Sequence, residues 1–241
     1  MPILVLEGIS KRFGAVVVAE RIGFELSEGE ALGIIGPNGA GKTTLFSIAA
    51  GTIAPDTGRV LFAGEDVTRL PAERRCRKGL VRSFQIPQPF SGMTVFENVV
   101  VAAAFGANEA ENAVYDRCAE LLDSCGLLNK ANRQAGGLTL LDRKRLELAR
   151  ALATKPRVLL LDEVAGGLTE HECAALVALI KNVRASGVSI VWIEHVVHAL
   201  LATVDRLLVL HGGKLIAQGD PHTVIRSPQV AEIYMGIAAD A

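Results

Sequence analysis

Apolar and polar positions follow two different periods along the chain. Short apolar or alternating runs, the pattern of strands, fill the first part, and stretches with helical spacing separate the later runs. The run that ends at residue 35 has no polar break, as expected of a strand buried in a parallel sheet. The expected strands are Ile3–Ile9, Val16–Ala19, Ile22–Leu26, Ala31–Ile35, Val158–Leu161, Val188–Ile193, Arg206–Leu210 and Lys214–Gln218, with a hairpin over Arg59–Val67.

Helical patterns fall between these strands. One helix is expected from about Lys42 to Ala50, with Gly51 as its C-terminal stop. Helical spacing dominates from about Thr94 to Leu152, another helix covers about Glu170 to Ala185, and Pro221 opens a late helix. This order favours an α/β core on a mostly parallel sheet, with a helical insertion in the middle and an antiparallel edge.

Composition narrows the possible partners. The chain has 241 residues, half of them hydrophobic, which is enough to bury one sizeable core. Its 25 basic and 26 acidic residues give a formal net charge of −1, so no strong field attracts nucleic acid, and no nucleic-acid partner is expected. The cysteines form no close metal-ligand pair and fit a reducing compartment; they are Cys76, Cys118, Cys125 and Cys173.

No segment has the pattern of a signal peptide or a membrane span. Met1–Ile9 lacks a basic start and a cleavable apolar run. No apolar run reaches the length of about 18 residues that a membrane helix needs. The longest candidate, Val188–Leu210, is interrupted by charged residues and histidines. Any membrane role is therefore expected to depend on a partner.

A glycine-rich loop between an expected strand and an expected helix carries the strongest chemical signal. Its pattern is Gly, any four residues, Gly, Lys, and then Ser or Thr. The backbone of such a loop wraps around a phosphate, with successive N–H groups pointing inward. Lys42 would bridge the β- and γ-phosphates, and the hydroxyl of Thr43 would hold Mg²⁺. A chance glycine-rich turn is the alternative, which the flanking strand and helix disfavour. This phosphate loop comprises Gly36, Pro37, Asn38, Gly39, Ala40, Gly41, Lys42, Thr43 and Thr44.

Two carboxylates follow the apolar run Val158–Leu161. Ligands of parallel sheets bind outside the carboxyl ends of the strands, so both acids are placed for chemistry. Asp162 is expected to steady Mg²⁺ from the second shell or through water, and Glu163 to polarise an attacking water as a general base. Many buried strands end in acids, but together with the phosphate loop this pair indicates nucleotide hydrolysis.

Further segments, taken in order, make the chain resemble the ABC transporter ATPase family over almost its whole length. Gln85, at the end of an Arg-Ser-Phe-Gln segment, resembles the family's Q-loop glutamine, and His195 resembles its switch histidine. Phe13 matches the aromatic residue that stacks on adenine, and Leu168-Thr169 matches the D-loop. Taken singly, Phe13 could fill a hairpin core, His195 could be a surface histidine, and Gln85 would carry no information.

The resemblance implies an α/β fold with a P-loop NTPase (RecA-like) core on a mostly parallel sheet, an antiparallel β subdomain, and a helical subdomain at about 86–155. All lie in one nucleotide-binding domain over 1–241. It implies ATP hydrolysis with ATP and Mg²⁺ as cofactors. The implied catalytic residues are Glu163, His195, Gln85 and Lys42. The implied Mg²⁺ residues are Thr43, Gln85 and Asp162. The implied nucleotide contacts are the phosphate loop, Phe13, Gln85, Asp162, His195 and, from the other subunit, Thr139.

The family's signature segment, usually Leu-Ser-Gly-Gly-Gln, is altered in this chain. Thr139 keeps a hydroxyl that would bond the γ-phosphate across a dimer. If Thr139 caps the following helix, Leu140 and Leu141 still offer backbone N–H groups at a helix N-terminus. The negative charge of Asp142 is unfavourable near a phosphate unless it turns away. The competence of this segment, Leu138 to Asp142, is therefore left open.

Some of these segments, with Met93–Val99, resemble the branch that serves uptake of branched-chain amino acids and related amino acids or amides. That resemblance implies a second ATPase subunit, alike or different, transmembrane permease subunits and, indirectly, a periplasmic binding protein. It implies a place at the cytoplasmic face of the inner or plasma membrane, held there by the permease.

Other functions are compatible with the same motifs. They are the ATPase of another ABC system, such as a lipopolysaccharide exporter, or a weakly hydrolysing partner in an asymmetric ATPase heterodimer. The segments around Gln85 and His195 argue against an ordinary P-loop kinase or GTPase. A basic stretch could meet anionic lipids but is more typical of a solvated helix face. It comprises Arg69, Arg74, Arg75, Arg77, Lys78 and Arg82.

Overall fold

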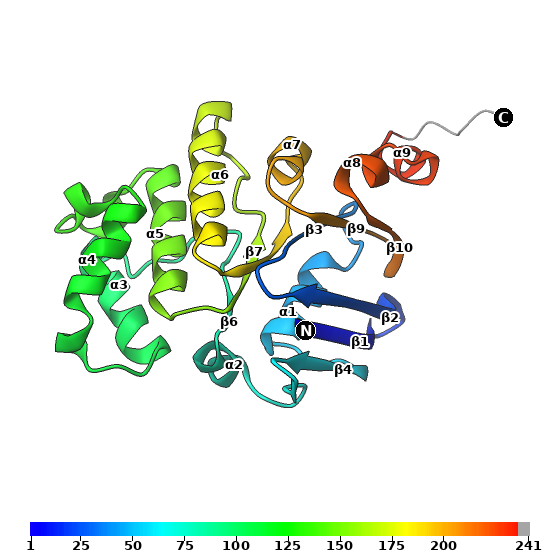
Figure 1. The fold of residues 1–241 in the computed structure, drawn as a ribbon, viewed down its shortest axis with the longest axis horizontal. Coiled ribbons are helices and arrows are strands. Elements are labelled where there is room, and N and C mark those ends of the chain that lie inside the picture. The colour runs from blue at the N-terminus through cyan, green and yellow to red at the C-terminus, as the bar shows by residue number, and fades with distance from the viewer. Residues whose placement is uncertain (236–241) are drawn as a thin grey trace.

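Two β-sheets and a set of helices make up residues 1–235, the part of the chain that the computed structural model describes (Figure 1). The first sheet is antiparallel and has the strand order β2-β1-β4-β5. Its strands are β1 (Pro2–Phe13), β2 (Val16–Ser27), β4 (Thr57–Phe62) and β5 (Glu65–Asp66).

The second sheet has six strands in the order β10-β9-β3-β8-β7-β6. All neighbours are parallel except β10, which runs antiparallel to β9 at one edge. The expected mostly parallel sheet with an antiparallel edge is therefore confirmed. Its strands are β3 (Ala31–Ile35), β6 (Leu80–Arg82), β7 (Val158–Asp162), β8 (Ser189–Ile193), β9 (Arg206–His211) and β10 (Lys214–Gly219).

Helices connect these strands and cover the parallel sheet. The α-helices are α1 (Lys42–Ala50), α2 (Ala72–Lys78), α3 (Val95–Val101), α4 (Tyr115–Ser124), α5 (Leu140–Ala153), α6 (Glu170–Ala185), α7 (Val197–Leu201), α8 (Pro221–Ile225) and α9 (Pro228–Met235). A π-helical turn, η1 (Ala102–Gly106), extends α3, and short 3₁₀ turns are η2 (Glu111–Ala113), η3 (Leu128–Lys130) and η4 (Ala135–Gly137).

The parallel sheet separates two hydrophobic cores. Because side chains alternate along a strand, Leu32 and Ile34 of β3 face the core shared with α1 and the antiparallel sheet. Ala31 and Ile35 face the other core, which α6 and α7 cover. The strands β3, β7 and β8 are thus buried on both faces of the sheet. This explains why apolar and polar residues do not alternate along them.

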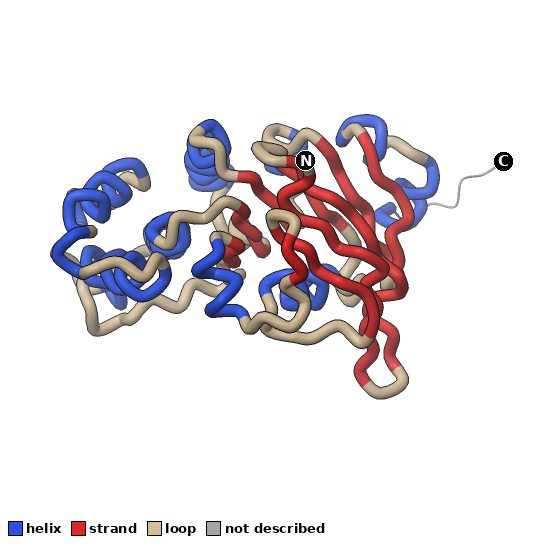
Figure 2. The backbone as a smooth tube through the Cα atoms, turned by 60° about the horizontal axis from the view of Figure 1, so that its bottom comes forward, coloured by secondary structure: helices blue, strands red, loops and turns tan. Residues whose placement is uncertain are grey.

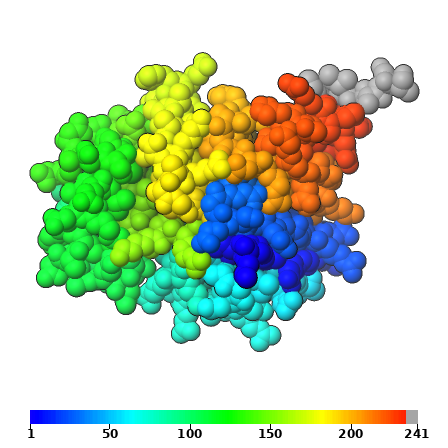
Figure 3. Space-filling view, viewed as in Figure 1, coloured from blue at the N-terminus to red at the C-terminus, as the bar shows by residue number. Residues whose placement is uncertain are grey.

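The segment between β6 and β7 is helical and contains α3, α4 and α5. Its apolar side chains, among them Val99, Leu122 and Leu146, belong to the same core as Leu161 and Trp192 of the parallel sheet. Figure 2 shows the strands gathered on one side of the molecule and these helices on the other. In the space-filling view the helical segment, in green, lies directly beside α6, in yellow (Figure 3).

Most expected elements appear within a residue or two of their predicted ends. The expected separate strands Val16–Ala19 and Ile22–Leu26 are wrong, however, because they form the single strand β2. Arg21 has a positive φ of 51° between them, and the register with β1 shifts around Lys11. The chain therefore passes the polar break with a local irregularity in the ladder rather than with a turn.

Candidate functional site

The phosphate loop joins the end of β3 to the start of α1. Gly41 precedes α1 with φ 97° and supplies no side-chain cap, so the first amides of the helix are free to meet an anion. A Cβ on Gly41 would lie 2.0 Å from the carbonyl oxygen of Val18, and one on Gly36 would lie 2.3 Å from that of Leu210. Both glycines are therefore required by close backbone approaches on either side of the loop.

Lys42 is folded into this loop. Its Nζ donates hydrogen bonds to the carbonyl oxygens of Gly36, at 2.7 Å, and Pro37, at 3.1 Å. Burial lowers the pKa of Lys42, although the nearby carboxylates of Glu163 and Asp162 act in the opposite direction. The ammonium group therefore lies inside the loop, on the side of the two acids.

Three predicted residues meet at the carboxyl ends of neighbouring strands. Gln85 follows β6, Glu163 follows β7 and His195 follows β8, and these strands are adjacent in the sheet. Gln85 Nε2 donates to Glu163 Oε2 at 2.5 Å, and His195 Nε2 lies 2.8 Å from Glu163 Oε1. The Glu163 side chain is 16% exposed and that of His195 41%, so the cluster is open to solvent on the histidine side.

Asp162, the last residue of β7, lies behind this cluster and is almost fully buried. One carboxylate oxygen, Oδ2, accepts a hydrogen bond from Arg82 Nη2 at 2.7 Å. The other, Oδ1, is buried without a hydrogen-bond partner among the described residues. A buried carboxylate oxygen without a partner is costly, so the site fits a cation or a cation-bound water.

The sequence did not single out Glu194, which is 1% exposed. Its Oε1 accepts from the backbone N–H of Ala165 at 2.6 Å, and its Oε2 accepts from that of His195 at 2.9 Å. Glu194 therefore ties the chain after Glu163 to the chain that carries His195. Its only sequence signal was a carboxylate directly after a buried strand, the same signal that marked Asp162.

Thr139 caps α5 as expected, because its hydroxyl accepts from the backbone N–H of Asp142 at 3.3 Å. Asp142 does not complete a capping box. Its carboxylate turns inward, is bonded by Lys130 Nζ at 2.5 Å and lies 3.9 Å from Arg145 Nη1. The charge of Asp142 is therefore paired away from the start of α5, where Leu140 is 44% exposed.

Phe13 lies at the end of the β1–β2 hairpin, and 48% of it is exposed. It does not fill a hairpin core, and Lys11 Nζ lies 5.5 Å from its ring centroid. The aromatic face of Phe13 is thus at the surface.

Thr169 of the expected D-loop caps α6 and forms a full capping box with Glu172. Thr169 therefore has a defined structural role.

The interpretation of the basic stretch as a solvated helix face is wrong for two of its members. Arg75, on α2, is 1% exposed and donates to the carbonyl oxygens of Ile48 and Ala49 at the end of α1. Burial lowers its pKa to about 10. The side chain of Arg82 is 10% exposed and bonds Asp162. Both arginines therefore have acceptors that lie far away in sequence, although Arg75 also bonds the nearby carbonyl oxygens of Thr68 and Leu70.

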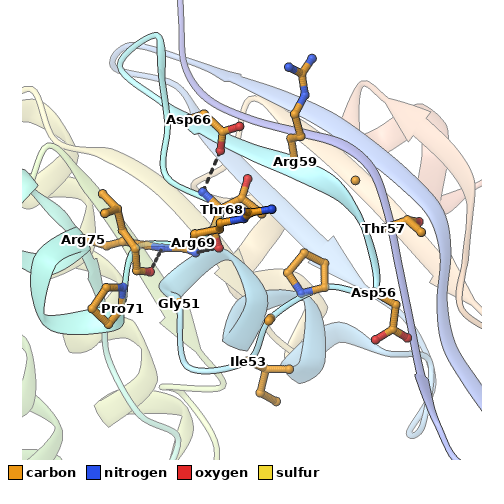
Figure 4. Close-up of a pocket in the computed structure, with 14 residues that line it drawn as sticks. Gly51, Ile53, Asp56, Thr57, Arg59, Asp66, Thr68, Arg69, Pro71 and Arg75 are labelled. Atoms are coloured by element: carbon orange, nitrogen blue, oxygen red, sulfur yellow. Dashed lines mark hydrogen bonds between the residues drawn. The ribbon is translucent and has the colours of Figure 1, made fainter.

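A cavity of about 940 Å³ lies at the end of α1, away from the predicted site residues. Figure 4 shows its lining, in which Arg75 contacts the segment before α2 and Asp66 bonds Thr68. None of the residues predicted for nucleotide chemistry lines it. The site described here is instead an open surface formed by four strand ends.

The fold and the phosphate loop together define an α/β nucleotide-binding protein of the P-loop class. The ABC transporter family model matches residues 19–166. LivG of Escherichia coli, a high-affinity branched-chain amino acid transport ATP-binding protein, is 36% identical over 98% of this chain and 99% of its own. BraF of Pseudomonas aeruginosa, a protein of the same description, is 35% identical over the same shares.

A solved structure supports the same assignment. The ADP conformation of MJ1267, an ATP-binding cassette of an ABC transporter, matches with a TM-score of 0.90 at 31% identity, over 98% of this chain and all of that one. This chain therefore belongs to the ABC transporter family and is one of its ATP-binding cassette ATPases. Among residues 1–235, no helix combines the length and apolar character needed to cross a membrane.

Proposed function

We propose that this chain is the ATP-hydrolysing subunit of an importer for branched-chain amino acids or related amino acids and amides. The observation that carries the hydrolytic part is the contact of Glu163 with both Gln85 and His195 beside the phosphate loop. The substrate class rests on the near full-length similarity to LivG and BraF.

In this proposal the phosphate loop and Lys42 hold the ATP phosphates, and Phe13 stacks on the base. Glu163 acts as the general base toward water, because its carboxylate is held by Gln85 and His195 at the strand ends. His195 contacts the γ-phosphate when the Glu163 contact is exchanged for it. Bound nucleotide would also replace the loop carbonyls as the partner of Lys42.

Mg²⁺ would be held by Thr43, Gln85 and Asp162 together with the phosphates, and it would neutralise charge that develops on them. The unpartnered Oδ1 of Asp162 supports this assignment. Within the described residues no three His, Cys, Asp or Glu side chains form a metal site of their own. That suits a cation that binds mainly through nucleotide phosphates and water.

A second ATPase subunit, alike or different, would complete the site with Thr139 and the first amides of its α5. The inward turn of Asp142 supports this role, because it removes the charge that would repel a phosphate. The side chains of Leu140 and Leu141 make the segment bulkier than the usual glycines. We therefore expect this signature to serve a partner's site less well than an unaltered one.

Permease subunits would dock beside Gln85, where the exposed apolar side chains of Ile86 and Phe90 follow it. Through them the subunit would lie at the cytoplasmic face of the membrane and respond indirectly to a periplasmic binding protein. We propose that residues 1–241 form one nucleotide-binding domain with a helical subdomain at about 86–155.

The test is steady-state ATP hydrolysis by the purified chain over a range of protein concentrations. Glu163→Gln is expected to keep ATP binding and lose turnover. Activity that rises more than linearly with concentration would show that two copies complete a site. Undiminished turnover in Glu163→Gln would refute the role of Glu163, and binding without turnover in the unaltered chain would indicate a different partner subunit.

A further inference from the structure

Arg82 is the last residue of β6 and lies three residues before Gln85. Its guanidinium donates to Asp162 Oδ2 through Nη2, at 2.7 Å, and to Ser47 Oγ through Nη1, at 2.9 Å. The side chains of Arg82 and Asp162 are 10% and 3% exposed. The pair is therefore largely removed from solvent, where its geometry is held more firmly than that of a surface ion pair.

Two aromatic rings hold the same guanidinium. Its central carbon lies 6.0 Å from the centroid of Phe46 on α1 and 5.6 Å from that of Phe84, next to Gln85. Both distances are within the range of cation–π attraction. Arg82 thus contacts α1, the end of β7 and the segment that leads to Gln85.

The contact with Arg82 leaves Asp162 with one oxygen to offer. Oδ2 is engaged, and Oδ1 is buried without a partner in the described part of the chain. Because Arg82 fixes Oδ2, the carboxylate cannot rotate freely, and its orientation keeps Oδ1 as the free acceptor. An outer-shell partner that fixes a ligating carboxylate in this way typically raises metal affinity.

A second hydrogen bond of Arg82 leads, through Ser47, to the phosphate loop. Ser47 Oγ accepts from Arg82 and donates to the carbonyl oxygen of Thr43 at 2.8 Å. A continuous chain of hydrogen bonds therefore runs from Asp162 through Arg82 and Ser47 to Thr43. The two residues expected to face the cation are fixed relative to each other by Arg82.

We infer that Arg82 is a positioning residue for Mg²⁺: it fixes Asp162 and, through Ser47, the first turn of α1, so that Oδ1 and the Thr43 hydroxyl are presented together. This inference rests on the proposed nucleotide site. Arg82 itself contacts neither nucleotide nor cation in this scheme, and its positive charge alone would weaken cation binding. The two effects have opposite signs, so they can be separated by measurement.

The experiment measures binding of a fluorescent ADP analogue to the full chain, first in EDTA and then over a Mg²⁺ titration. Arg82→Met is expected to leave the affinity in EDTA unchanged and to raise the half-saturating Mg²⁺ concentration about 10-fold. Arg82→Lys, which keeps the charge but cannot bond Asp162 and Ser47 in the same fork, should fall between. Arg74→Met, an exposed arginine of α2, is the matched control and should titrate like the unaltered chain.

A half-saturating Mg²⁺ concentration that is unchanged or lower in Arg82→Met would overturn the inference. So would an equal loss of affinity in EDTA and in Mg²⁺, because that is the result of a general structural defect. Failure of the unaltered chain to bind nucleotide would refute the proposed function instead. If Arg82→Met does not fold by circular dichroism, the Arg82→Lys titration decides the question.

A double-variant cycle tests whether Arg82 acts on Mg²⁺ binding through Asp162. If Arg82 acts through Asp162, adding Arg82→Met to Asp162→Asn should raise the half-saturating Mg²⁺ concentration no further. Additive effects of the two substitutions would contradict that route.

Discussion

At the scale of single residues, the site depends on buried side chains that fix the backbone around it. Glu194 is an example, because its two carboxylate oxygens each accept one backbone N–H, from Ala165 and from His195. Glu194 is 1% exposed, so replacing it removes both acceptors at once from a place that water does not reach. The expected consequence is a less stable protein whose His195 is also less well placed.

We predict that Glu194→Ala lowers the free energy of unfolding by about 1–3 kcal/mol, the usual cost of leaving a buried donor unpaired. ATP turnover should fall as well. Urea unfolding and an ATPase assay check both. Glu120→Ala, on the exposed face of α4, is the control and should stay within about 0.5 kcal/mol. Unchanged stability in Glu194→Ala would mean that other groups satisfy the two amides.

At the scale of elements, the ends of the helices are fixed in different ways. α5 begins at a local cap, since the Thr139 hydroxyl accepts from an amide three residues later. Thr139→Ala is expected to lower the free energy of unfolding by about 1 kcal/mol, whereas Thr139→Ser should retain most of it because it keeps the acceptor. Urea unfolding distinguishes them, and an equal loss in both variants would argue against the cap.

α1 ends with help from another element. Arg75 donates to the carbonyl oxygens of Ile48 and Ala49, and also to those of Leu70 and Thr68. Arg75→Met should therefore lower the free energy of unfolding by about 1–3 kcal/mol, because buried acceptors lose their donor. Arg74→Met, on the exposed side of α2, is the control in the same urea experiment. Equal stabilities would show that water replaces the guanidinium.

These two helix ends show what the sequence can and cannot predict. The end of α1 at Gly51 and the cap of α5 are local, so the residue types reveal them directly. Two of the four acceptors of Arg75, and both acceptors of Arg82, lie 26 or more residues away, so the basic stretch looks solvated until the chain is folded. The inward turn of Asp142 depends likewise on Lys130, which no helical spacing pairs with it.

At the scale of the whole molecule, the site brings together segments from four strand ends. The phosphate loop and the acid pair could be recognised from local spacing, whereas Gln85 and His195 gained meaning only through resemblance to a family. Their contacts with Glu163 follow from the sheet order, which the sequence does not reveal. The same holds for Glu194.

The cores make a further prediction at this scale. Trp192 is the single tryptophan, and it is fully buried in the core that also contains Val99 and Leu122 of the helical segment. Because the parallel sheet and the helical segment share this core, the helical segment should unfold together with the sheet. Trp192 fluorescence and far-ultraviolet circular dichroism should give coincident urea transitions. Loss of helix signal before the fluorescence change would show that the helical segment unfolds separately.

The contact between Gln85 and Glu163 has a consequence for how binding of a docked protein and binding of nucleotide influence each other. Gln85 is exposed, while the Glu163 carboxylate is close enough to the phosphate loop to influence Lys42. If a permease docks beside Gln85 as proposed, the docked protein and a bound nucleotide would both bias this one hydrogen bond. Thermodynamic linkage requires their effects on each other's binding free energy to be equal. Measuring how nucleotide changes the affinity of a docked partner would therefore also give the influence of that partner on nucleotide affinity.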